Sequence, residues 1–186
     1  MPILGIIASQ NYPRITSSYE SIATVTVGSG GSTTVEFTSI PATYKHLQIR
    51  CLIKAINVNT DTTNLNITIN SGTQNVRSHA VRGNGSTVIA NSNAGFYYTI
   101  FVPSNTGYTN IFNASVIDIL DYADTNKNKT IRGIGGFDAN GSGTISFASC
   151  LFNTTTAISS IKFETDGGAF TGWAQYSQFA LYGIRA

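Results

Sequence analysis

The fold is decided by the stretch of residues 33–56, which reads TTVEFTSIPATYKHLQIRCLIKAI. Val35 and Phe37 alternate with polar neighbours, which is the period-2 pattern of a strand with one buried face. Pro41 interrupts the pattern, because its nitrogen carries no hydrogen for a strand ladder. From Tyr44 the alternation resumes with an apolar face and a polar face. The apolar face holds Leu47, Ile49, Cys51 and Ile53, and the polar face holds His46, Gln48, Arg50 and Lys54. The stretch therefore predicts two antiparallel strands with a core on one side and water on the other.

The same alternation recurs along the rest of the chain, and turn residues separate the segments. No window combines helical spacing with helix caps. Residues 111–120 predict a strand buried on both faces, because apolar Val116 and Leu120 alternate with Ile117 and Ile119. We expect an all-β fold: a single antiparallel β-sandwich of about eight to ten strands, most simply a jelly roll. A Greek-key sandwich of another topology fits the same pattern.

The first residues depart from the alternation and predict an extended N-terminal arm. An apolar patch is followed there by polar Ser9, Gln10 and Asn11, and it contains Ile3, Leu4, Ile6 and Ile7. Two interpretations remain: an arm that docks onto a partner, or a first strand packed on its own core. The arm interpretation implies an assembly, since an exposed apolar segment needs covering. We expect an arm over residues 1–20 and the sandwich domain over residues 21–186.

Composition excludes several classes of protein. Charged residues make up 11% of the chain, against about 25% in ordinary soluble domains. The net charge is +2 and the basic residues are scattered, so a nucleic-acid partner is not expected. The apolar patch at the N-terminus is too short for a signal-peptide core or a membrane span, and we expect a protein made in the cytoplasm without a membrane segment. Two cysteines, Cys51 and Cys150, cannot make a disulfide framework.

Catalytic and metal-binding patterns are weak. The chain has two histidines, His46 and His79, and neither belongs to a nucleophile motif. No pair of acids suggests glycoside hydrolysis. We expect neither an enzyme nor a cofactor. Three oxygen-bearing side chains match the beginning of a calcium loop, but the twelfth position is a serine and a hairpin turn explains the glycines equally well. These weak metal candidates are Asp138, Asn140 and Ser142.

Aromatic residues near polar loops give a candidate glycan-binding site. Aromatic rings stack on sugar rings, while carboxylate and amide groups bond their hydroxyls. The candidate residues are Tyr122, Asp124, Asn126 and Trp173. The alternative is that the aromatics close the core or fill an oligomer interface.

Six segments spread over the chain carry a resemblance to a known family: GIIASQ at 5–10, YESIATVTVG at 19–28, FTSIPATYKHL at 37–47, GNGST at 83–87, IDILDY at 117–122 and FALYGI at 179–184. Together they resemble small virion structural proteins of tailed bacteriophages, of the cyanophage and marine-phage type. These are strand ends and turns without a catalytic signature. The resemblance implies a protein of the virion, without fixing its position on the particle.

The compact chain lacks a shaft repeat or coiled coil, which favours a capsid cement or decoration protein over a fibre. We expect it to form a symmetric homo-oligomer, with a trimer favoured, and to contact other virion proteins such as the major capsid protein through its arm. The alternative is a tail-fibre or receptor-binding module that recognises a carbohydrate of the host surface.

Overall fold

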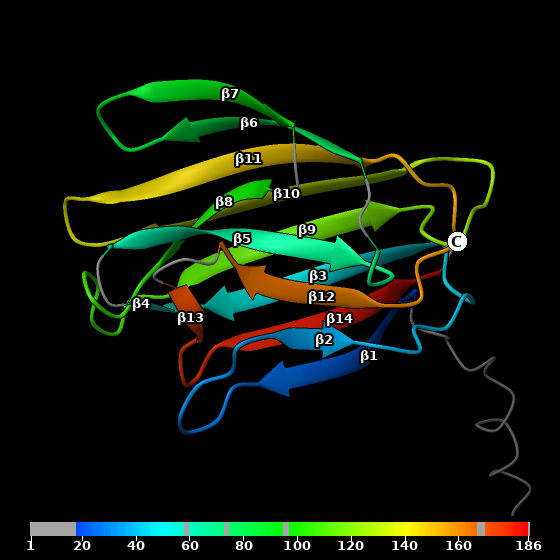
Figure 1. Cartoon of the computed structure of the whole chain (residues 1–186), viewed down its shortest axis with the longest axis horizontal. Helices are drawn as coiled ribbons and strands as arrows, with labels where there is room; N and C mark the ends of the chain where they lie inside the picture. Colours follow the sequence, from blue (N-terminus) through cyan, green and yellow to red (C-terminus); the bar gives the residue numbers. More distant parts are fainter. Residues whose placement is uncertain (1–17, 58–59, 73–74, 95–96, 167–169, 186) are drawn as a thin grey trace, which may run out of the picture.

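The structure is a computed structural model that describes residues 18–57, 60–72, 75–94, 97–166 and 170–185 (Figure 1). Within these residues the chain forms fourteen strands and no helix. The strands are β1 (Tyr19–Thr26), β2 (Val35–Phe37), β3 (His46–Ile53), β4 (Ala55–Asn57), β5 (Thr62–Ile69), β6 (Val76–Gly83), β7 (Val88–Ala94), β8 (Tyr97–Pro103), β9 (Asn113–Leu120), β10 (Lys129–Asp138), β11 (Gly143–Phe152), β12 (Ile161–Thr165), β13 (Phe170–Trp173) and β14 (Gln178–Ile184). The described part of the chain thus contains no apolar helix that could cross a membrane.

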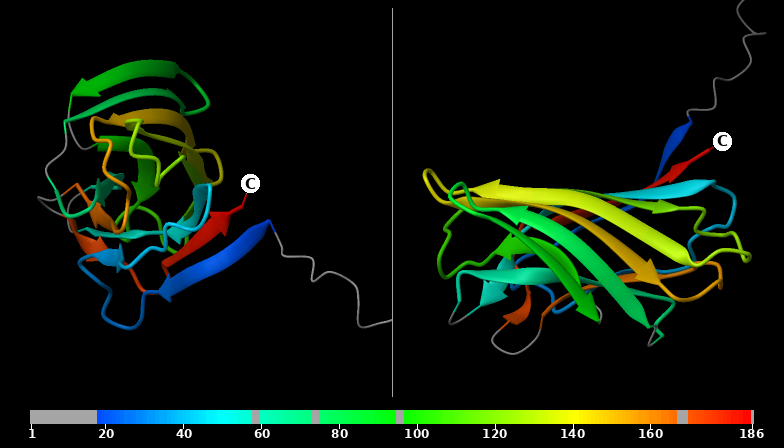
Figure 2. Two further views of the ribbon diagram at one scale, coloured as in Figure 1. Left: turned by 90° about the vertical axis from the view of Figure 1, so that its right-hand side faces the viewer. Right: turned by 90° about the horizontal axis from the view of Figure 1, so that it is seen from above.

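The strands form two main antiparallel sheets. The large sheet has the order β1-β14-β3-β9-β10-β11-β6-β7, and the small sheet has the order β2-β12-β5-β8. A third, two-stranded sheet joins β13 to β4. The views from the end and from above show the large sheet curving over the smaller one (Figure 2). The expected all-β, antiparallel fold is confirmed, and the arrangement is that of a β-sandwich.

Chain order and pairing order are related in a simple way. The early strands pair with the late strands in reverse: β1 with β14, β2 with β12, β3 with β9, and β5 with β8. Two hairpins, β6–β7 and β10–β11, are inserted between these strands and extend the large sheet. Consequently the first described strand lies beside the last one.

The core lies between the two sheets, where the alternation predicted it. Leu47, Ile49 and Ile53 of β3 are completely buried. Phe163 of the small sheet contacts Phe179 of the large sheet, with 5.0 Å between the ring centroids. Such interlocking of side chains from two inner faces is what stabilises a sandwich.

Both cysteines are buried and free, one on β3 and the other on β11. Burial raises the pKa of both thiols, that of Cys150 to about 12. They act as small apolar side chains of the core.

Three predictions about strands need correction. The number of strands exceeds the expected eight to ten, partly because β4 and β13 were not predicted. The strand β1 begins at Tyr19, two residues before the expected start of the domain. The strand expected at residues 111–120 begins at Asn113 and is buried on one face only: Ile117 and Ile119 point into the core, while Val116 is 37% exposed on the other face.

Candidate functional site

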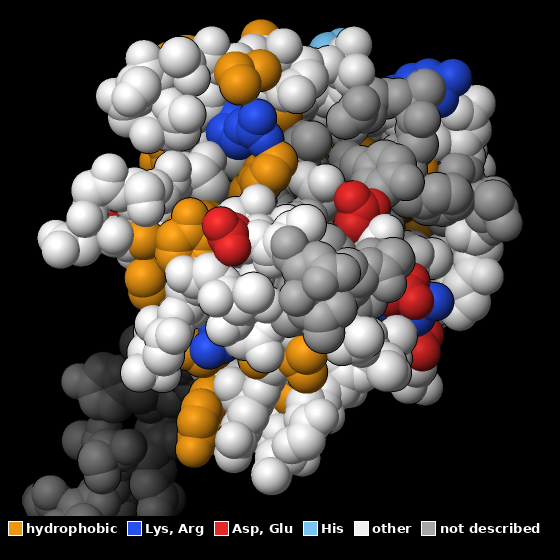
Figure 3. Space-filling model, turned by 60° about the vertical axis from the view of Figure 1, so that its left-hand side comes forward, with side chains coloured by type: hydrophobic (Ala, Val, Ile, Leu, Met, Phe, Trp, Pro, Cys, Tyr) orange, Lys and Arg blue, Asp and Glu red, His pale blue; other side chains and the backbone are white. Residues whose placement is uncertain are grey.

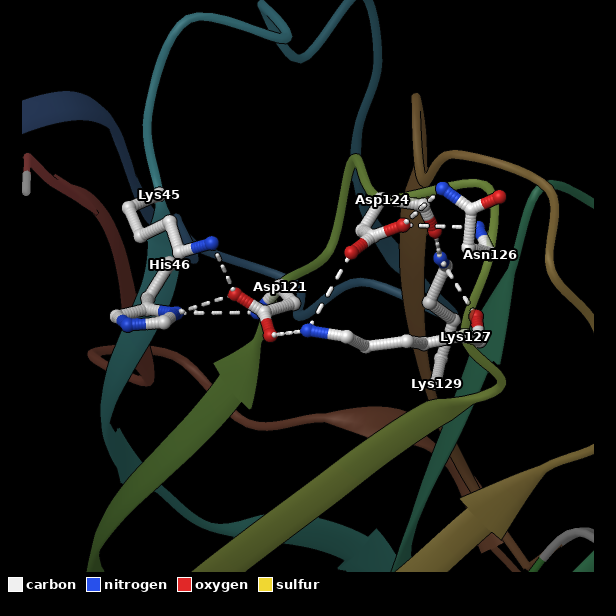
Figure 4. A network of polar contacts seen from close by, with 7 residues as sticks. All are labelled: Lys45, His46, Asp121, Asp124, Asn126, Lys127 and Lys129. Atoms are coloured by element: carbon white, nitrogen blue, oxygen red, sulfur yellow. Dashed lines mark hydrogen bonds and ion pairs between the residues drawn. The ribbon is translucent and has the colours of Figure 1, made fainter.

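The charged side chains after β9 bind one another (Figure 4). The carboxylate of Asp121 forms ion pairs with Lys45 at 2.8 Å and with Lys127 at 2.6 Å. Its backbone N–H donates to Nδ1 of His46 at 3.0 Å. The hydrogen bonds from Lys127 and then from Lys45 hold the pKa of the Asp121 carboxyl well below its usual range. This carboxylate is therefore occupied by the lysines of its own loop and of the segment before β3.

The rest of the loop is held by hydrogen bonds among its own residues. The carboxylate of Asp124 accepts hydrogen bonds from the backbone N–H and the side-chain amide of Asn126, at 2.8 and 3.2 Å. The first of these lowers the pKa of the Asp124 carboxyl. Lys129 is completely buried, and its ammonium donates to the backbone carbonyls of Asp124 and Lys127. Burial lowers the pKa of Lys129. The polar groups of this loop thus stabilise its own conformation.

The two aromatic members of the predicted glycan site are not exposed, so that part of the prediction is wrong. Tyr122 and Trp173 are both completely buried. The hydroxyl of Tyr122 donates to the carbonyl of Pro41, and the indole N–H of Trp173 donates to the carbonyl of Phe163 at 3.2 Å. Buried Tyr and Trp rings contribute apolar area and satisfy their polar atom inside the protein. Neither ring can stack on a sugar, whereas Asp124 and Asn126 lie together on the surface loop.

The three weak metal candidates form the turn between β10 and β11. The carboxylate of Asp138 accepts the backbone N–H of Asn140 at 2.8 Å, and Ala139 N–H donates to Ser142 O at 2.7 Å. Asn140 and Gly141 have φ angles of 55° and 107°. Two consecutive residues with positive φ are typical of a tight hairpin turn, for which the Asn-Gly pair is favoured. The structure assigns this segment to a hairpin.

The predicted partner-binding residues Ile3, Leu4, Ile6 and Ile7 lie outside the described residues.

The most unusual surface lies on the outer face of the large sheet. Val116, Ile134, Phe147 and Val81 stand opposite one another on the four neighbouring strands β9, β10, β11 and β6. Each is more than a third exposed, and Phe147 is 55% exposed. We call this surface the apolar face and define it by these four residues together with Leu52 and Ile145. An exposed, contiguous apolar patch marks a place where another molecule binds.

A groove of about 990 Å³ runs over one part of the apolar face and is lined by four of its six defining residues, all but Val81 and Phe147. Its shape follows from residue size. Leu52, Ala114, Gly136 and Ile145 lie in one row across β3, β9, β10 and β11. The two small residues form a low floor between the two large ones. Two turns line one end of the groove: the turn between β10 and β11, which ends at Gly143, and the turn after Gly83.

The groove is nearly free of charge. Among its described lining residues only Arg50 and Asp138 are charged. The guanidinium of Arg50 lies over the rings of Tyr19 and Tyr182, 5.3 and 5.6 Å from their centroids. On another side of the molecule hydrophobic side chains lie in small groups among uncharged polar ones, and single Lys, Arg, Asp and Glu side chains stand between these groups (Figure 3). A surface of this kind offers apolar contact to a partner, and the described residues that line the groove include no paired acid and base groups.

The described residues contain no group of three or more His, Cys, Asp or Glu side chains that could hold a metal ion.

Comparisons with family models, with characterised proteins and with solved structures find no match to this chain.

Sequence reasoning missed the apolar face because it assigned Val116 to the core. The available signal was an excess of apolar residues on both faces of neighbouring strands. Ile134 and Phe147, for example, lie on the opposite face from Ile131 and Ala148, which are buried. In an antiparallel sheet with one solvated face, such residues indicate a second contact surface.

Proposed function

We propose that this chain is a structural protein on the surface of a bacteriophage particle, most simply a capsid cement or decoration protein. The proposal rests on the resemblance to phage virion proteins and on one observation, the apolar face. A cement protein acts by contact, and it needs a surface that neighbouring subunits cover.

The size of the apolar face supports a binding role. Its six defining side chains are between 37% and 59% exposed. If a large side chain presents about 150–200 Å² when fully exposed, the face offers on the order of 500 Å². Patches of about 300–600 Å² on single subunits are often functional, and a stable interface buries about 800 Å² per partner. The face therefore supplies much of one interface, and its surroundings supply the remainder.

The strand pairing supports the same proposal. The eight strands that pair in reverse order correspond to one long antiparallel hairpin rolled into two sheets, with first paired to eighth and fourth to fifth. We infer that this framework is a jelly roll with two inserted hairpins. Jelly rolls form capsid domains and also lectin domains, so the fold alone does not separate a shell protein from a sugar-binding one.

The low charge fits assembly by contact. Burying a charged group without a partner is costly, whereas uncharged polar side chains are easier to cover. A chain with 11% charged residues can form extensive contacts at little desolvation cost. We propose that it forms a homo-oligomer, with a trimer favoured, and that it contacts the major capsid protein or a tail component.

The test is a count of copies in purified phage particles by quantitative mass spectrometry with labelled reference peptides. The major capsid protein, counted in the same sample, is the internal control. Hundreds of copies in a fixed ratio to that protein support the cement role. A few to a few dozen copies place the chain on the tail and overturn that role. Absence from purified particles overturns the virion proposal altogether.

A further inference from the structure

We propose that the groove on the apolar face binds the apolar N-terminal segment, residues 3–8, of a second copy of this chain. The proposal rests on the assembly role above and names the occupant of the same surface. It turns the face into one half of a self-complementary contact, whose other half is the arm.

The groove suits an extended apolar segment in its chemistry. Its walls are formed by Leu52, Val116 and Ile145, and its floor by Ala114 and Gly136. Residues 3–8 read ILGIIA and carry no charge. The segment therefore brings no charge into a groove that has only two charged residues in its described lining, so covering it desolvates few ions.

The groove also suits the segment in its dimensions. Its lining extends over the six strands from β14 to β6, which is five strand spacings or about 24 Å, and the floor between Leu52 and Ile145 is three spacings, about 14 Å, wide. Six extended residues span about 20 Å, so the lined area can hold the segment. The small floor residues leave the depth that the side chains of such a segment fill.

Within one molecule the segment could reach the groove only with residues 9–18 almost fully extended. The floor residues Ala114 and Gly136 lie on β9 and β10, the third and fourth strands in from β1. Their row across the sheet is in register with Thr26, which lies seven residues along β1 from Tyr19. The straight distance from Tyr19 to this floor is about 28 Å, taking about 3.3 Å per residue along β1 and about 4.8 Å per strand spacing across the sheet. Residues 9–18 span at most about 33–36 Å when fully extended. Within one molecule the chain would also have to reverse direction before Tyr19, because β1 runs toward the groove end. A neighbouring copy has neither restriction.

The position of β1 suits an arm that leaves the molecule. Among the described strands β1 has a single neighbour, β14, and so lies at the edge of the large sheet. Ser18 is fixed by the hydrogen bond that its carbonyl accepts from Arg185 N–H at 2.9 Å. The segment before it therefore starts from a defined point at the edge of the sheet.

A first test measures self-association of the full chain by sedimentation equilibrium. We expect Val116→Asp to raise the dissociation constant of the oligomer by on the order of 100-fold, since it puts a charge into an apolar contact. Leu151→Asp is the matched control: Leu151 lies on the same outer face, is 40% exposed against 37% for Val116, and does not line the groove. Equal effects of both substitutions, or no effect of Val116→Asp, would overturn the proposal. Arg50 lies opposite Val116 and gives the new carboxylate a cationic neighbour, which helps the variant to fold.

A second test traps the contact covalently. Full chains carrying Ile6→Cys are mixed with full chains carrying Ala114→Cys under mild oxidation, and disulfide-linked dimers are detected by mass spectrometry. Leu151→Cys replaces Ala114→Cys in the control mixture. The native thiols of Cys51 and Cys150 are buried and their pKa is raised, so they react slowly.

The outcomes of the trap separate the alternatives. A mixed dimer that forms with Ala114→Cys and not with Leu151→Cys supports the proposal. Equal linkage in both mixtures shows non-specific contact and overturns it. A further chain carries both Ile6→Cys and Ala114→Cys. If this chain forms an internal disulfide while the mixture of single variants gives no mixed dimer, the segment covers its own groove and the role of a second copy is overturned. Because purified chains are used, these results are independent of the copy count in particles, which tests the virion role separately.

Discussion

Replacing Trp173 with alanine tests whether this ring belongs to the core or to a binding surface. The ring is completely buried, packs on Phe179 at 5.2 Å between centroids, and donates a hydrogen bond to Phe163 O at 3.2 Å. A buried Trp removes about 200 Å² from water, which corresponds to about 5 kcal/mol, and Trp→Ala changes in cores cost about 3–5 kcal/mol. We therefore expect Trp173→Ala to lower the free energy of unfolding by about 4 kcal/mol.

The expected change in melting temperature follows from the chain length of 186 residues. With an unfolding entropy of about 2.1 cal/mol/K per residue, a loss of about 4 kcal/mol lowers Tm by about 10 °C. Trp173→Phe keeps most of the apolar area and removes the indole hydrogen bond, so we expect a loss of about 1–2 kcal/mol and a decrease in Tm of about 3–5 °C.

The assay is thermal and urea-induced unfolding followed by circular dichroism. In the unchanged protein the same transition is followed by fluorescence, because the chain has one tryptophan. Its emission should be that of an apolar environment and shift to longer wavelength on unfolding. If Trp173→Ala changed the free energy of unfolding by less than about 1 kcal/mol, or if the native emission were that of a hydrated indole, the assignment of this ring to the core would be refuted.

Three further predictions concern stability. The Asp121 carboxyl has a lowered pKa in the folded protein, so the stability that it contributes is present above its unfolded pKa of about 3.9 and is lost as the pH falls below that value. Asp121→Asn lacks this contribution, so the difference in free energy of unfolding between this variant and the unchanged protein should become smaller from about pH 5 to about pH 3, measured from urea midpoints. Lys127→Ala removes one ion-pair partner of the carboxylate and should show the same trend. Gly183→Ala should lower the free energy of unfolding by about 1–3 kcal/mol, because the added Cβ would lie 2.3 Å from the ring of Tyr44, and a melting temperature equal to that of the unchanged protein would contradict this packing. Gly141→Ala should cost about 1 kcal/mol through its φ of 107° alone, since no atom lies within 4 Å of the added Cβ, and a stabilised variant in the same melting assay would argue against the turn geometry.

The period-2 pattern predicted the core side of the sheet well. Leu47, Ile49 and Ile53 were assigned to one face of a strand, and they are buried on that face. The pattern is reliable there because the register of a half-buried strand is fixed by its apolar residues. It failed for β4, which follows β3 after a single residue with no turn signal between them, and for β13, a four-residue strand that contains a glycine.

The candidate site was much harder to predict. Apolar residues on the second face of a strand, such as Val116, have the same sequence pattern whether another layer of the same domain covers them or a partner does. Only the pairing of the strands shows that Val116, Ile134 and Phe147 form one continuous surface. The direction of a loop side chain cannot be read from the sequence either. Tyr122 comes two residues after the end of β9, a position where exposed residues are common, yet its ring is completely buried in the core.

The pairing of β1 with β14 has a consequence for synthesis of the protein. Among the described strands β14 is the sole neighbour of β1, and the register joins Tyr19 to Ile184, across almost the whole length of the chain. Contacts between such distant residues form late and slow the overall folding rate. During translation the first strand has to wait until the last one has left the ribosome. A chain that ends before β14 would leave β1 without this neighbour. On the proposal that residues 3–8 bind a second copy, the segment before Tyr19 would be anchored only in chains that have formed β14.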